Sequence, residues 1–333
     1  MLKKIIVIFL SLIFALIIFE LFLKYSPFKY GASPVKYDSQ IGMWHKKNYI
    51  GYTIKECYKT KYKFNSKGLP SSIYKYDLNK KDVILLGDSY IEAIMVQNKN
   101  IIHNALAKEF HGKYNFLNYG LSSTSPVQQF IILKDKVNLY NTKYIIQFIQ
   151  LEGDLMDVNS KNLSLLARPK VFMNFKDLNH YQIIPPRNET FYDYVGDILD
   201  NYQLYTFIKK LLYYIKDNII SKNNQSSIKV IPKKNKELFN NWLFLEGAIH
   251  QTNKYIKILN GNIKYKVIVN SKNNKNKIKI KNFLENEGIE FIFLDDMLEI
   301  NNIRYTIFKC DGHWDDELHK NIAKMIKNSG FIK

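Results

Sequence analysis

The 333-residue sequence predicts an α/β fold: a doubly wound, mostly parallel sheet preceded by one N-terminal transmembrane helix. Three observations lead to this fold class. The chain begins with a long apolar run. From residue 83 onward, short apolar runs typical of buried strands alternate with helical patterns. Several of these strands end in polar, glycine-containing turns. Strands that alternate with helices imply right-handed crossovers and therefore a parallel sheet.

The first element is the apolar run Ile5–Leu23, which is interrupted only by one serine and by Glu20. Nineteen helical residues rise about 28 Å, close to the thickness of the hydrocarbon core of a bilayer. No small-residue cleavage site follows, so we expect residues 1–24 to be an uncleaved, single-pass anchor. The basic lead-in Met1–Lys4 favours a cytoplasmic start and an extracytoplasmic domain, although three lysines just past the helix oppose this orientation.

Residues 25–80 are rich in Tyr, Lys, Gly and Ser and have little periodicity, so we expect a stalk that then packs along the domain. The domain itself is expected over residues 81–333. Its strands are predicted at Val83–Leu86, Tyr114–Asn118, Tyr144–Ile149, Tyr265–Asn270 and Glu290–Leu294. Helical patterns lie at Ile101–Phe110, Val127–Leu139, Lys275–Glu287 and Leu318–Ile326.

The stretch from about residue 159 to residue 260 is longer than one crossover needs, and we expect an insertion that covers the active-site edge. Residues Asn201–Ile220 carry the pattern of an amphipathic helix. Six aromatic residues of the insertion could stack on sugar rings or simply pack within it: Phe172, Phe175, Tyr181, Phe191, Tyr192 and Tyr194.

The charge and the cysteines limit the function classes. The net charge of +19 comes from lysines spread along the chain, with no arginine-rich stripe or nucleic-acid motif, so we expect no nucleic-acid partner. A basic surface can still favour anionic lipids or acidic glycans. Cys57 and Cys310 are either a disulfide or two buried thiols; a disulfide would clamp the loop that carries Asp311 to the N-terminal segment.

Candidate chemistry lies in two places. Gly87-Asp88-Ser89 follows the first predicted strand, where a serine hydroxyl would be exposed at the start of a helix. Asp311-Gly312-His313-Trp314 precedes the last predicted helix. Serine is a poor nucleophile until a histidine takes its proton, and the histidine needs a carboxylate to orient it. We therefore predict Ser89 as nucleophile, His313 as base and Asp311 as orienter.

These segments resemble the blocks of the SGNH, or GDSL-type, hydrolases. Gly87-Asp88-Ser89 is similar to the nucleophile block, and Leu117–Ser125 to the second block, whose glycine, here Gly120, lends an oxyanion N–H. Asp311-Gly312-His313-Trp314 resembles the last block in the Asp-x-His-Trp form of membrane-anchored, polysaccharide-modifying members. The resemblance implies an α/β/α sandwich that runs over most of the chain.

One block departs from the family pattern. In the stretch Phe148–Leu155, Gly153 stands where the family has an asparagine that donates to the oxyanion. Losing one such donor typically costs about 10²–10³ in kcat. The N–H groups of Ser89 and Gly120 are expected to remain, and Gln150, Asn159 or an ordered water could replace the missing donor.

The resemblance implies a serine esterase or acyl transferase that forms an acyl-enzyme on Ser89 and acts on O-acyl groups of a cell-envelope polysaccharide, with O-acetyl the expected group. The alternative is a catalytically weakened glycan-binding or accessory protein of polysaccharide assembly. No cofactor is expected, and the cluster of acids and histidines around His313 matches no zinc spacing.

Overall fold

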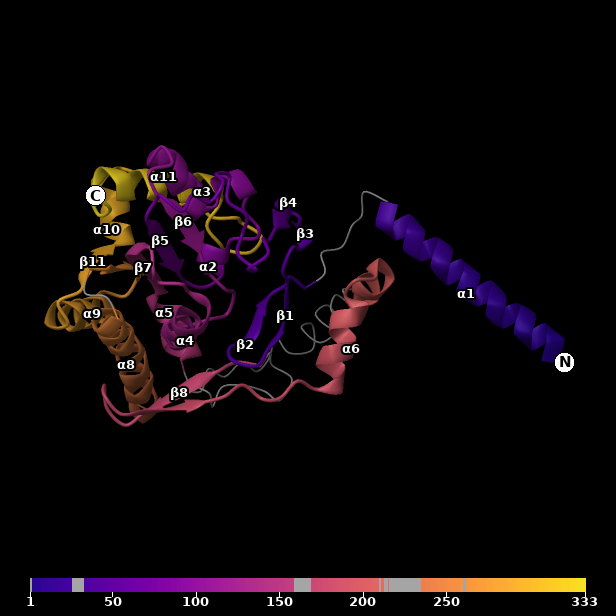
Figure 1. The fold of residues 1–333 in the computed structure, drawn as a ribbon. Helices are drawn as coiled ribbons and strands as arrows, with labels where there is room; N and C mark the ends of the chain where they lie inside the picture. The colour runs from indigo at the N-terminus through magenta and orange to yellow at the C-terminus, as the bar shows by residue number, and fades with distance from the viewer. Residues whose placement is uncertain are drawn as a thin grey trace, which may run out of the picture.

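A computed structural model describes residues 2–25, 33–158, 169–209, 211–212, 215, 235–259 and 262–333, with the side chains of 235–240 left out. Its centre is a five-stranded parallel sheet in the order β11-β10-β7-β5-β6 (Figure 1). Ile84 lies opposite Leu117 on one side and Ile145 on the other. The strands are β5 (Asp82–Leu86), β6 (Asn115–Asn118), β7 (Thr142–Gln150), β10 (Lys264–Asn270) and β11 (Glu290–Phe293). All five strands that the sequence predicts are present, with ends shifted by no more than two residues.

Helices cover both faces of this sheet, as Figure 1 shows, because the central strands are apolar on both sides. Val83 and Leu85 point to one face, and Ile84 and Leu86 to the other; all four are fully buried. The first face carries α3 (Ile102–Glu109), α10 (Leu294–Ile300) and α11 (Asp316–Asn328). The second carries α4 (Pro126–Lys136), α8 (Asn235–Leu259) and α9 (Asn274–Asn286). The doubly wound α/β prediction is thus confirmed.

The strand order determines where a site can form. The chain runs from β5 outward to the edge strand β6, then returns past β5 to β7 and continues to β10 and β11. The direction of winding reverses between β5 and β7. In doubly wound sheets the crevice at such a reversal, at the carboxyl ends of the strands, is where ligands bind.

The long helix α8 was not predicted. It packs against α4, and Trp242, Leu245 and Ile249 are buried in the core. It is thus the crossover helix between β7 and β10, although it falls within the range that we assigned to an insertion. Its apolar positions are separated by polar ones such as Asn241 and Gln251, which are themselves buried and weaken the helical pattern.

Residues 33–63, which we expected to begin as a stalk, form two antiparallel hairpins: β1 (Val35–Asp38) with β2 (Gly42–His45), and β3 (Ile50–Lys55) with β4 (Tyr58–Lys63). In β4, Tyr-Lys-Thr-Lys-Tyr-Lys alternates with a period of two, and Thr60 and Tyr62 are buried while the lysines are exposed. That alternation is the strand signal.

The described chain also includes a long N-terminal helix and parts of the expected insertion. Helix α1 (Leu2–Tyr25) is long and apolar enough to cross a membrane by length and composition. The hairpin β8 (Phe172–Phe175) and β9 (Tyr181–Ile184) is followed by α6 (Phe191–Leu199). The predicted amphipathic helix is helical at 203–209, 211–212 and 215; part of its range lies outside the described residues.

Candidate active site

Ser89 is the first residue of the short helix α2 (Ser89–Glu92), directly after β5. The Asp88 carboxylate caps this helix, because its Oδ1 accepts the N–H of Tyr90 at 2.9 Å. The turn requires Gly87, since a Cβ there would lie 2.3 Å from Ile91. The backbone N–H of Ser89 has no hydrogen-bond partner among the described residues. The serine therefore stands at the carboxyl edge of the sheet with its own N–H free.

His313 meets this serine from the other end of the chain. Its Nε2 lies 2.9 Å from Ser89 Oγ, within hydrogen-bond distance, although 224 residues separate the two. The Tyr90 ring lies against the imidazole, with ring centroids 4.9 Å apart. The next residue, Trp314, is buried and donates its Nε1–H to the Tyr305 hydroxyl at 2.8 Å. These contacts hold the loop before α11 over α2.

Asp311 lies behind the imidazole. Its Oδ1 accepts the backbone N–H of His313 at 3.1 Å and lies 3.3 Å from His313 Nδ1. The contact with Nδ1 lacks the alignment of a hydrogen bond. The structure thus brings Ser89, His313 and Asp311 together. The contact between Ser89 and His313 has better hydrogen-bond geometry than the contact between His313 Nδ1 and Asp311.

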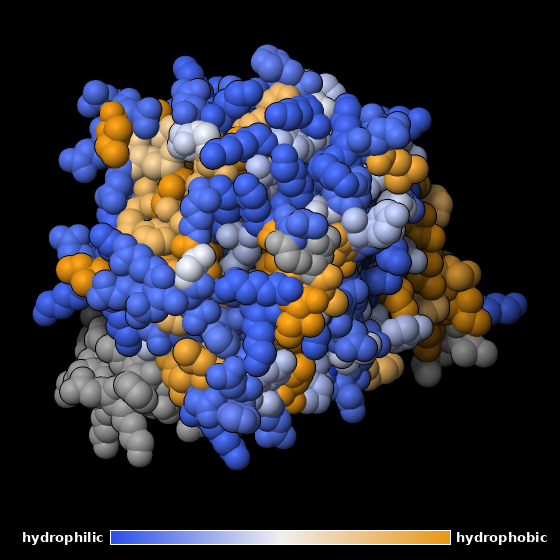
Figure 2. All heavy atoms as spheres, turned by 60° about the vertical axis from the view of Figure 1, so that its left-hand side comes forward, coloured by the Kyte–Doolittle hydropathy of each residue, from blue (hydrophilic) through white to orange (hydrophobic). Residues whose placement is uncertain are grey.

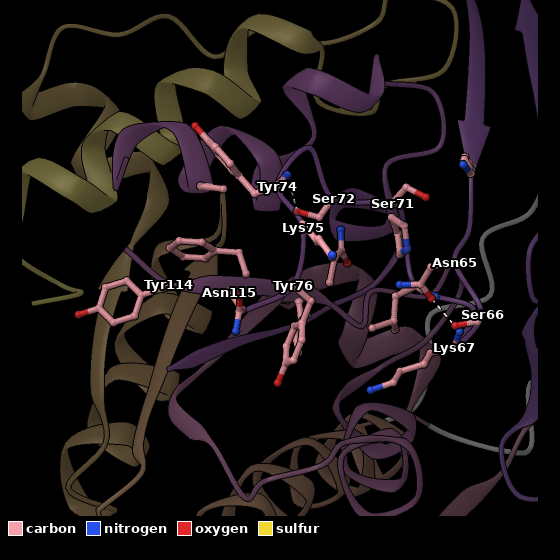
Figure 3. A pocket seen from close by; sticks show the side chains of 17 residues that line it. Asn65, Ser66, Lys67, Ser71, Ser72, Tyr74, Lys75, Tyr76, Tyr114 and Asn115 are labelled. Atoms are coloured by element: carbon pink, nitrogen blue, oxygen red, sulfur yellow. Dashed lines mark hydrogen bonds between the residues drawn. The ribbon is translucent and has the colours of Figure 1, made fainter. Parts of the chain in front are cut away.

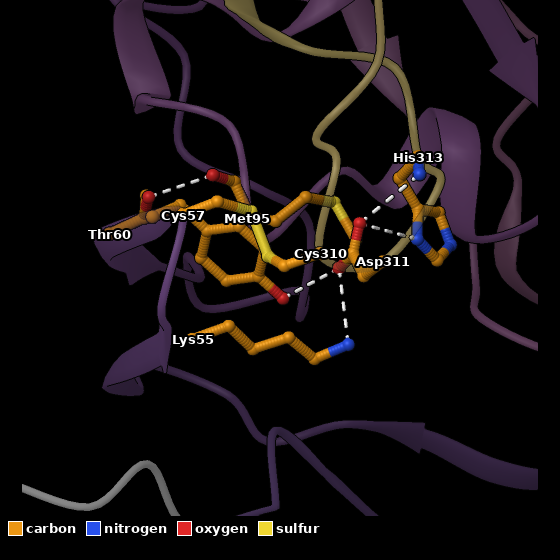
Figure 4. Close-up of a disulfide and its surroundings, with 8 residues drawn as sticks. Lys55, Cys57, Thr60, Met95, Cys310, Asp311 and His313 are labelled. Atoms are coloured by element: carbon orange, nitrogen blue, oxygen red, sulfur yellow. Dashed lines mark hydrogen bonds and ion pairs between the residues drawn. A yellow bond between two sulfur atoms is a disulfide. The ribbon is translucent and has the colours of Figure 1, made fainter.

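The hairpin β3–β4 supports Asp311 from outside the sheet (Figure 4). Its Oδ2 accepts the Tyr58 hydroxyl at 2.7 Å and Lys55 Nζ at 3.4 Å. Cys57 and Cys310, with Cα atoms 5.8 Å apart, form the disulfide that was one of the two sequence alternatives. Burial raises the pKa of Asp311, but the hydrogen bonds from Tyr58 and His313 and the charges of His313 and Lys55 outweigh it, so that the net pKa is lowered. Asp311 is therefore a carboxylate at neutral pH.

Gly120 follows β6 and approaches α2 closely: a Cβ there would lie 2.4 Å from the backbone nitrogen of Glu92. Its N–H, which the resemblance assigns to the oxyanion hole, donates to Asn118 Oδ1 at 2.9 Å. Asn118 in turn donates to the carbonyl of Ile91 at 2.6 Å. Gly120 thus lies beside α2, the helix that begins at Ser89, but its N–H already donates to Asn118.

Gly153 lies in the helix α5 (Leu151–Asp157), just after β7, and nothing lies within 4 Å of where its Cβ would be. Of the replacement donors considered above, Asn159 is outside the described residues. The Gln150 side chain accepts a hydrogen bond from Asn270 Nδ2 at Oε1, at 2.6 Å, and its Nε2 is buried without a partner. This amide is therefore an unused donor at the same edge of the sheet.

Four acidic residues lie near Ser89: Asp88, Glu92, Asp154 and Asp157. Burial raises the pKa of Asp88 to about 7, and the charges of Asp157 and Glu92 add to the effect. Burial also raises the pKa of Asp154 well above its ordinary value, and the charges of Asp88 and Asp157 add to it. Asp154 accepts the backbone N–H of Gln150 at 2.8 Å. Across the described residues, no group of three or more His, Cys, Asp or Glu could hold a metal ion.

The sequence did not reveal a second buried cluster beside the site. His45 Nε2 lies 2.6 Å from Glu92 Oε1, and Glu92 Oε2 accepts the N–H of Ser122 at 3.0 Å and also its hydroxyl. The His45 ring stacks on Phe64, with centroids 4.2 Å apart. Glu92 therefore joins α2, the Gly120 loop and hairpin β1–β2. In the sequence, the only sign of this cluster was the single glutamate in the short segment that begins at Ser89.

A cavity of about 410 Å³ lies elsewhere, beside the edge strand β6 (Figure 3). Its lining includes Lys63, Lys67 and Lys75 together with Tyr74 and Tyr76. None of the three residues predicted for catalysis lines it.

No family model matches the sequence, and no curated protein matches it. The structure is similar to several solved structures at low identity. One is described as a lipolytic protein of the G-D-S-L family from Desulfitobacterium hafniense (11% identity, 75% of this chain and 99% of that chain, TM-score 0.40). Another is a GDSL-like lipase from Bacteroides thetaiotaomicron (11%, 77% and 91%, TM-score 0.37). A third is a two-domain esterase active on acetylated mannans (9%, 75% and 48%, TM-score 0.41).

Proposed function

We propose that this chain is a serine-dependent ester hydrolase or acyl transferase of the SGNH type. The observation that carries the proposal is the 2.9 Å contact between Ser89 Oγ and His313 Nε2, with Asp311 behind the imidazole. A histidine that accepts a proton from a serine at the start of a helix, and is itself backed by a carboxylate, is the arrangement that serine acyl transfer needs.

The reaction would run in two steps. His313 Nε2 takes the Ser89 proton as Oγ attacks the ester carbonyl, and the leaving alcohol takes that proton as the acyl-enzyme forms. His313 then deprotonates a water or a sugar hydroxyl, which attacks the acyl-enzyme; the bond to Ser89 Oγ breaks, and His313 returns the proton to Ser89. Water gives hydrolysis and a hydroxyl gives transfer, with the same residues in both cases.

The charge that develops on the carbonyl oxygen needs donors. The free N–H of Ser89 is one, and we assign the unpaired Gln150 Nε2 as the second. The Gly120 N–H could contribute only by exchanging its bond to Asn118 for one to the oxyanion. Gly153 has a backbone N–H in the first turn of α5 but no side-chain donor.

The proposed substrate is an O-acyl group, in the first place O-acetyl, on a cell-envelope polysaccharide. The apolar helix α1 supports a single-pass membrane anchor, and the sequence resemblance supports a glycan ester. The disulfide fits an extracytoplasmic domain, because disulfides persist in oxidising compartments. The basic composition of the chain would suit an acidic glycan.

The test is turnover of p-nitrophenyl acetate by the full chain in detergent micelles, with and without a glycan acceptor. Ser89→Ala and His313→Ala should each reduce turnover to background, whereas the matched controls Ser72→Ala and His180→Ala, both at exposed positions, should retain it. Background turnover in the folded wild-type protein with all short acyl esters tried would favour the alternative, a glycan-binding or accessory protein. The observation that favours this alternative is the Gly120 N–H, which donates to Asn118 and is therefore not available to an oxyanion.

A further inference from the structure

Helix α6 presents large apolar side chains to solvent. Phe191, Tyr192, Tyr194 and Ile198 are 75%, 86%, 56% and 44% exposed. Phe191, Tyr194 and Ile198 are spaced three and four residues apart and therefore share one side of the helix. The helix is well formed, because Thr190 caps its N-terminus with a capping box. Contiguous exposed apolar surface of this kind marks an interaction site.

The acidic groups of α6 attach it to its own chain. Arg187 donates to Asp193 at 2.6 Å, and Lys46, just after β2, lies 3.9 Å from Asp197. Asp193 is thus paired within the segment that leads into α6, and Asp197 is paired with a cation next to hairpin β1–β2. The helix is amphipathic, and its large apolar side chains are exposed.

The apolar surface continues into the next helical segment. Ile208, Leu211, Leu212 and Ile215 are each between 41% and 61% exposed. The face of the molecule that carries α8 and α9 is largely hydrophilic but also has several apolar patches (Figure 2). We call the exposed apolar side chains of α6 and of the described helical residues 203–209, 211–212 and 215 the apolar shelf.

The shelf touches the proposed membrane anchor. The Glu20 carboxylate of α1 accepts the backbone N–H groups of Gln203 and Leu204, at 2.9 and 2.7 Å. Phe19 and Phe207 meet edge to face, with centroids 6.1 Å apart. Figure 1 shows α6 on the side of the domain from which α1 extends. The contact places the shelf beside the last turns of α1.

The position of Glu20 along α1 indicates how deep in the bilayer the apolar shelf would lie. Glu20 lies five residues before the end of the helix at Tyr25, which is a rise of about 8 Å. Interfacial amphipathic helices bury their apolar face about 5–10 Å into the boundary between headgroups and acyl chains. Tyrosine is a preferred residue at that level, because its ring is apolar and its hydroxyl is polar.

We propose that the apolar shelf lies in the lipid–water interface of the membrane that α1 crosses, so that the partner of this surface is the bilayer itself. The inference rests on α1 being a membrane anchor, as proposed above. The domain is then held to the membrane at two places, by α1 and by the shelf. The side that carries hairpin β1–β2, which α6 contacts, faces the lipid.

The test uses the full chain in phosphatidylethanolamine–phosphatidylglycerol vesicles, spin-labelled at one introduced cysteine; the native cysteines are in a disulfide and do not react. Labels are placed at Tyr192→Cys in the shelf, Phe14→Cys in α1 and Tyr140→Cys, a tyrosine that is 93% exposed in the domain. Collision with oxygen, which concentrates in lipid, is compared with collision with a water-soluble nickel chelate. Ile198→Cys repeats the measurement in case position 192 perturbs folding.

The label at 192 should collide with nickel several-fold less than the label at 140, and with oxygen several-fold more. A label at 192 as open to nickel as that at 140, with position 14 in lipid, would overturn the inference. Shielding at 192 from both reagents would also overturn it, because it would mean a protein contact such as a second copy of this chain. If the nickel chelate reaches the label at position 14, the proposal that α1 is a membrane anchor is itself contradicted.

Discussion

His45 and Glu92 form a fully buried pair in which Nε2 and Oε1 lie 2.6 Å apart and the side chains are 0% and 1% exposed. Glu92 is three residues after Ser89, and its other oxygen holds Ser122 of the Gly120 loop. Burial raises the pKa of Glu92, but the hydrogen bonds from His45 and Ser122 outweigh it and the pKa is lowered. An N-terminal hairpin thus stabilises the two segments that carry Ser89 and Gly120.

Replacing Glu92 with Gln should lower the free energy of unfolding by about 1–3 kcal/mol at pH 7, because a buried hydrogen bond to a charged group is lost. A lowered folded-state pKa contributes stability above the ordinary value of 4.5, and that contribution disappears as the pH falls through the folded pKa. Urea unfolding should therefore show a difference between wild type and variant that shrinks below about pH 4.5. Glu56→Gln, at an exposed position, is the control; a difference independent of pH would contradict the assignment.

Replacing Tyr58 with Phe removes the 2.7 Å hydrogen bond to Asp311 Oδ2. We expect kcat to fall up to about tenfold with little change in KM, because the bond positions Asp311 and does not touch the substrate. The pKa of Asp311 should rise, because this hydrogen bond is one of the interactions that lower it. Tyr140→Phe serves as a surface control. A change confined to KM would show that Tyr58 acts on substrate binding instead.

The disulfide between Cys57 and Cys310 closes a loop across 253 residues of sequence. The double variant Cys57→Ser, Cys310→Ser should lose about 2–5 kcal/mol of stability. The double variant should also be less active than the wild type at temperatures where it is still folded, because Cys310 directly precedes Asp311. Thermal melts and esterase rates with and without reductant check this. Reductant should affect the wild type and leave the double variant unchanged; equal sensitivity would mean that another group responds.

Replacing Asp154 with Asn should stabilise the protein, and more so at higher pH. An acid whose folded pKa is raised favours unfolding once the pH exceeds its unfolded value of 3.8, and increasingly so up to its folded pKa. The amide oxygen of asparagine can keep the bond to the N–H of Gln150. Urea midpoints at pH 5 and pH 8 measure the effect, with exposed Asp135→Asn as control. If the variant gains more stability at pH 5 than at pH 8, the pKa of Asp154 is not raised in the folded protein.

Replacing Gly153 with Asn offers the oxyanion a side-chain donor in the place that the family resemblance assigns to asparagine. The site has room, since nothing lies within 4 Å of the added Cβ. One donor is typically worth about 10²–10³ in kcat, and we expect a gain of about tenfold or more in p-nitrophenyl acetate turnover. Gly153→Ala separates the amide from the helix-stabilising effect of removing a glycine. An unchanged kcat in Gly153→Asn would place the oxyanion away from α5.

The sequence alone predicted the parallel sheet, because its strands are buried on both faces and so appear as unbroken apolar runs such as Val83–Leu86. It also predicted Ser89, Asp311 and His313, because a nucleophile, a base and an orienter are recognisable residue types at turns that follow strands or precede a helix. It did not predict hairpins β1–β2 and β3–β4. Strand β4, for example, alternates lysine with tyrosine and threonine, and its composition resembles that of a loop.

Tertiary structure decided the rest, because these contacts join residues that are far apart in sequence. The pairing of Cys57 with Cys310, the bond from Tyr58 to Asp311 and the burial of His45 against Glu92 each depend on where the N-terminal hairpins come to rest. Whether a glycine N–H is free for an oxyanion is equally a matter of geometry: Asn118, two residues before Gly120, folds back to accept it. Residue types and spacing identify the chemistry that a chain can carry, whereas the hydrogen-bond partners that regulate that chemistry are set by packing.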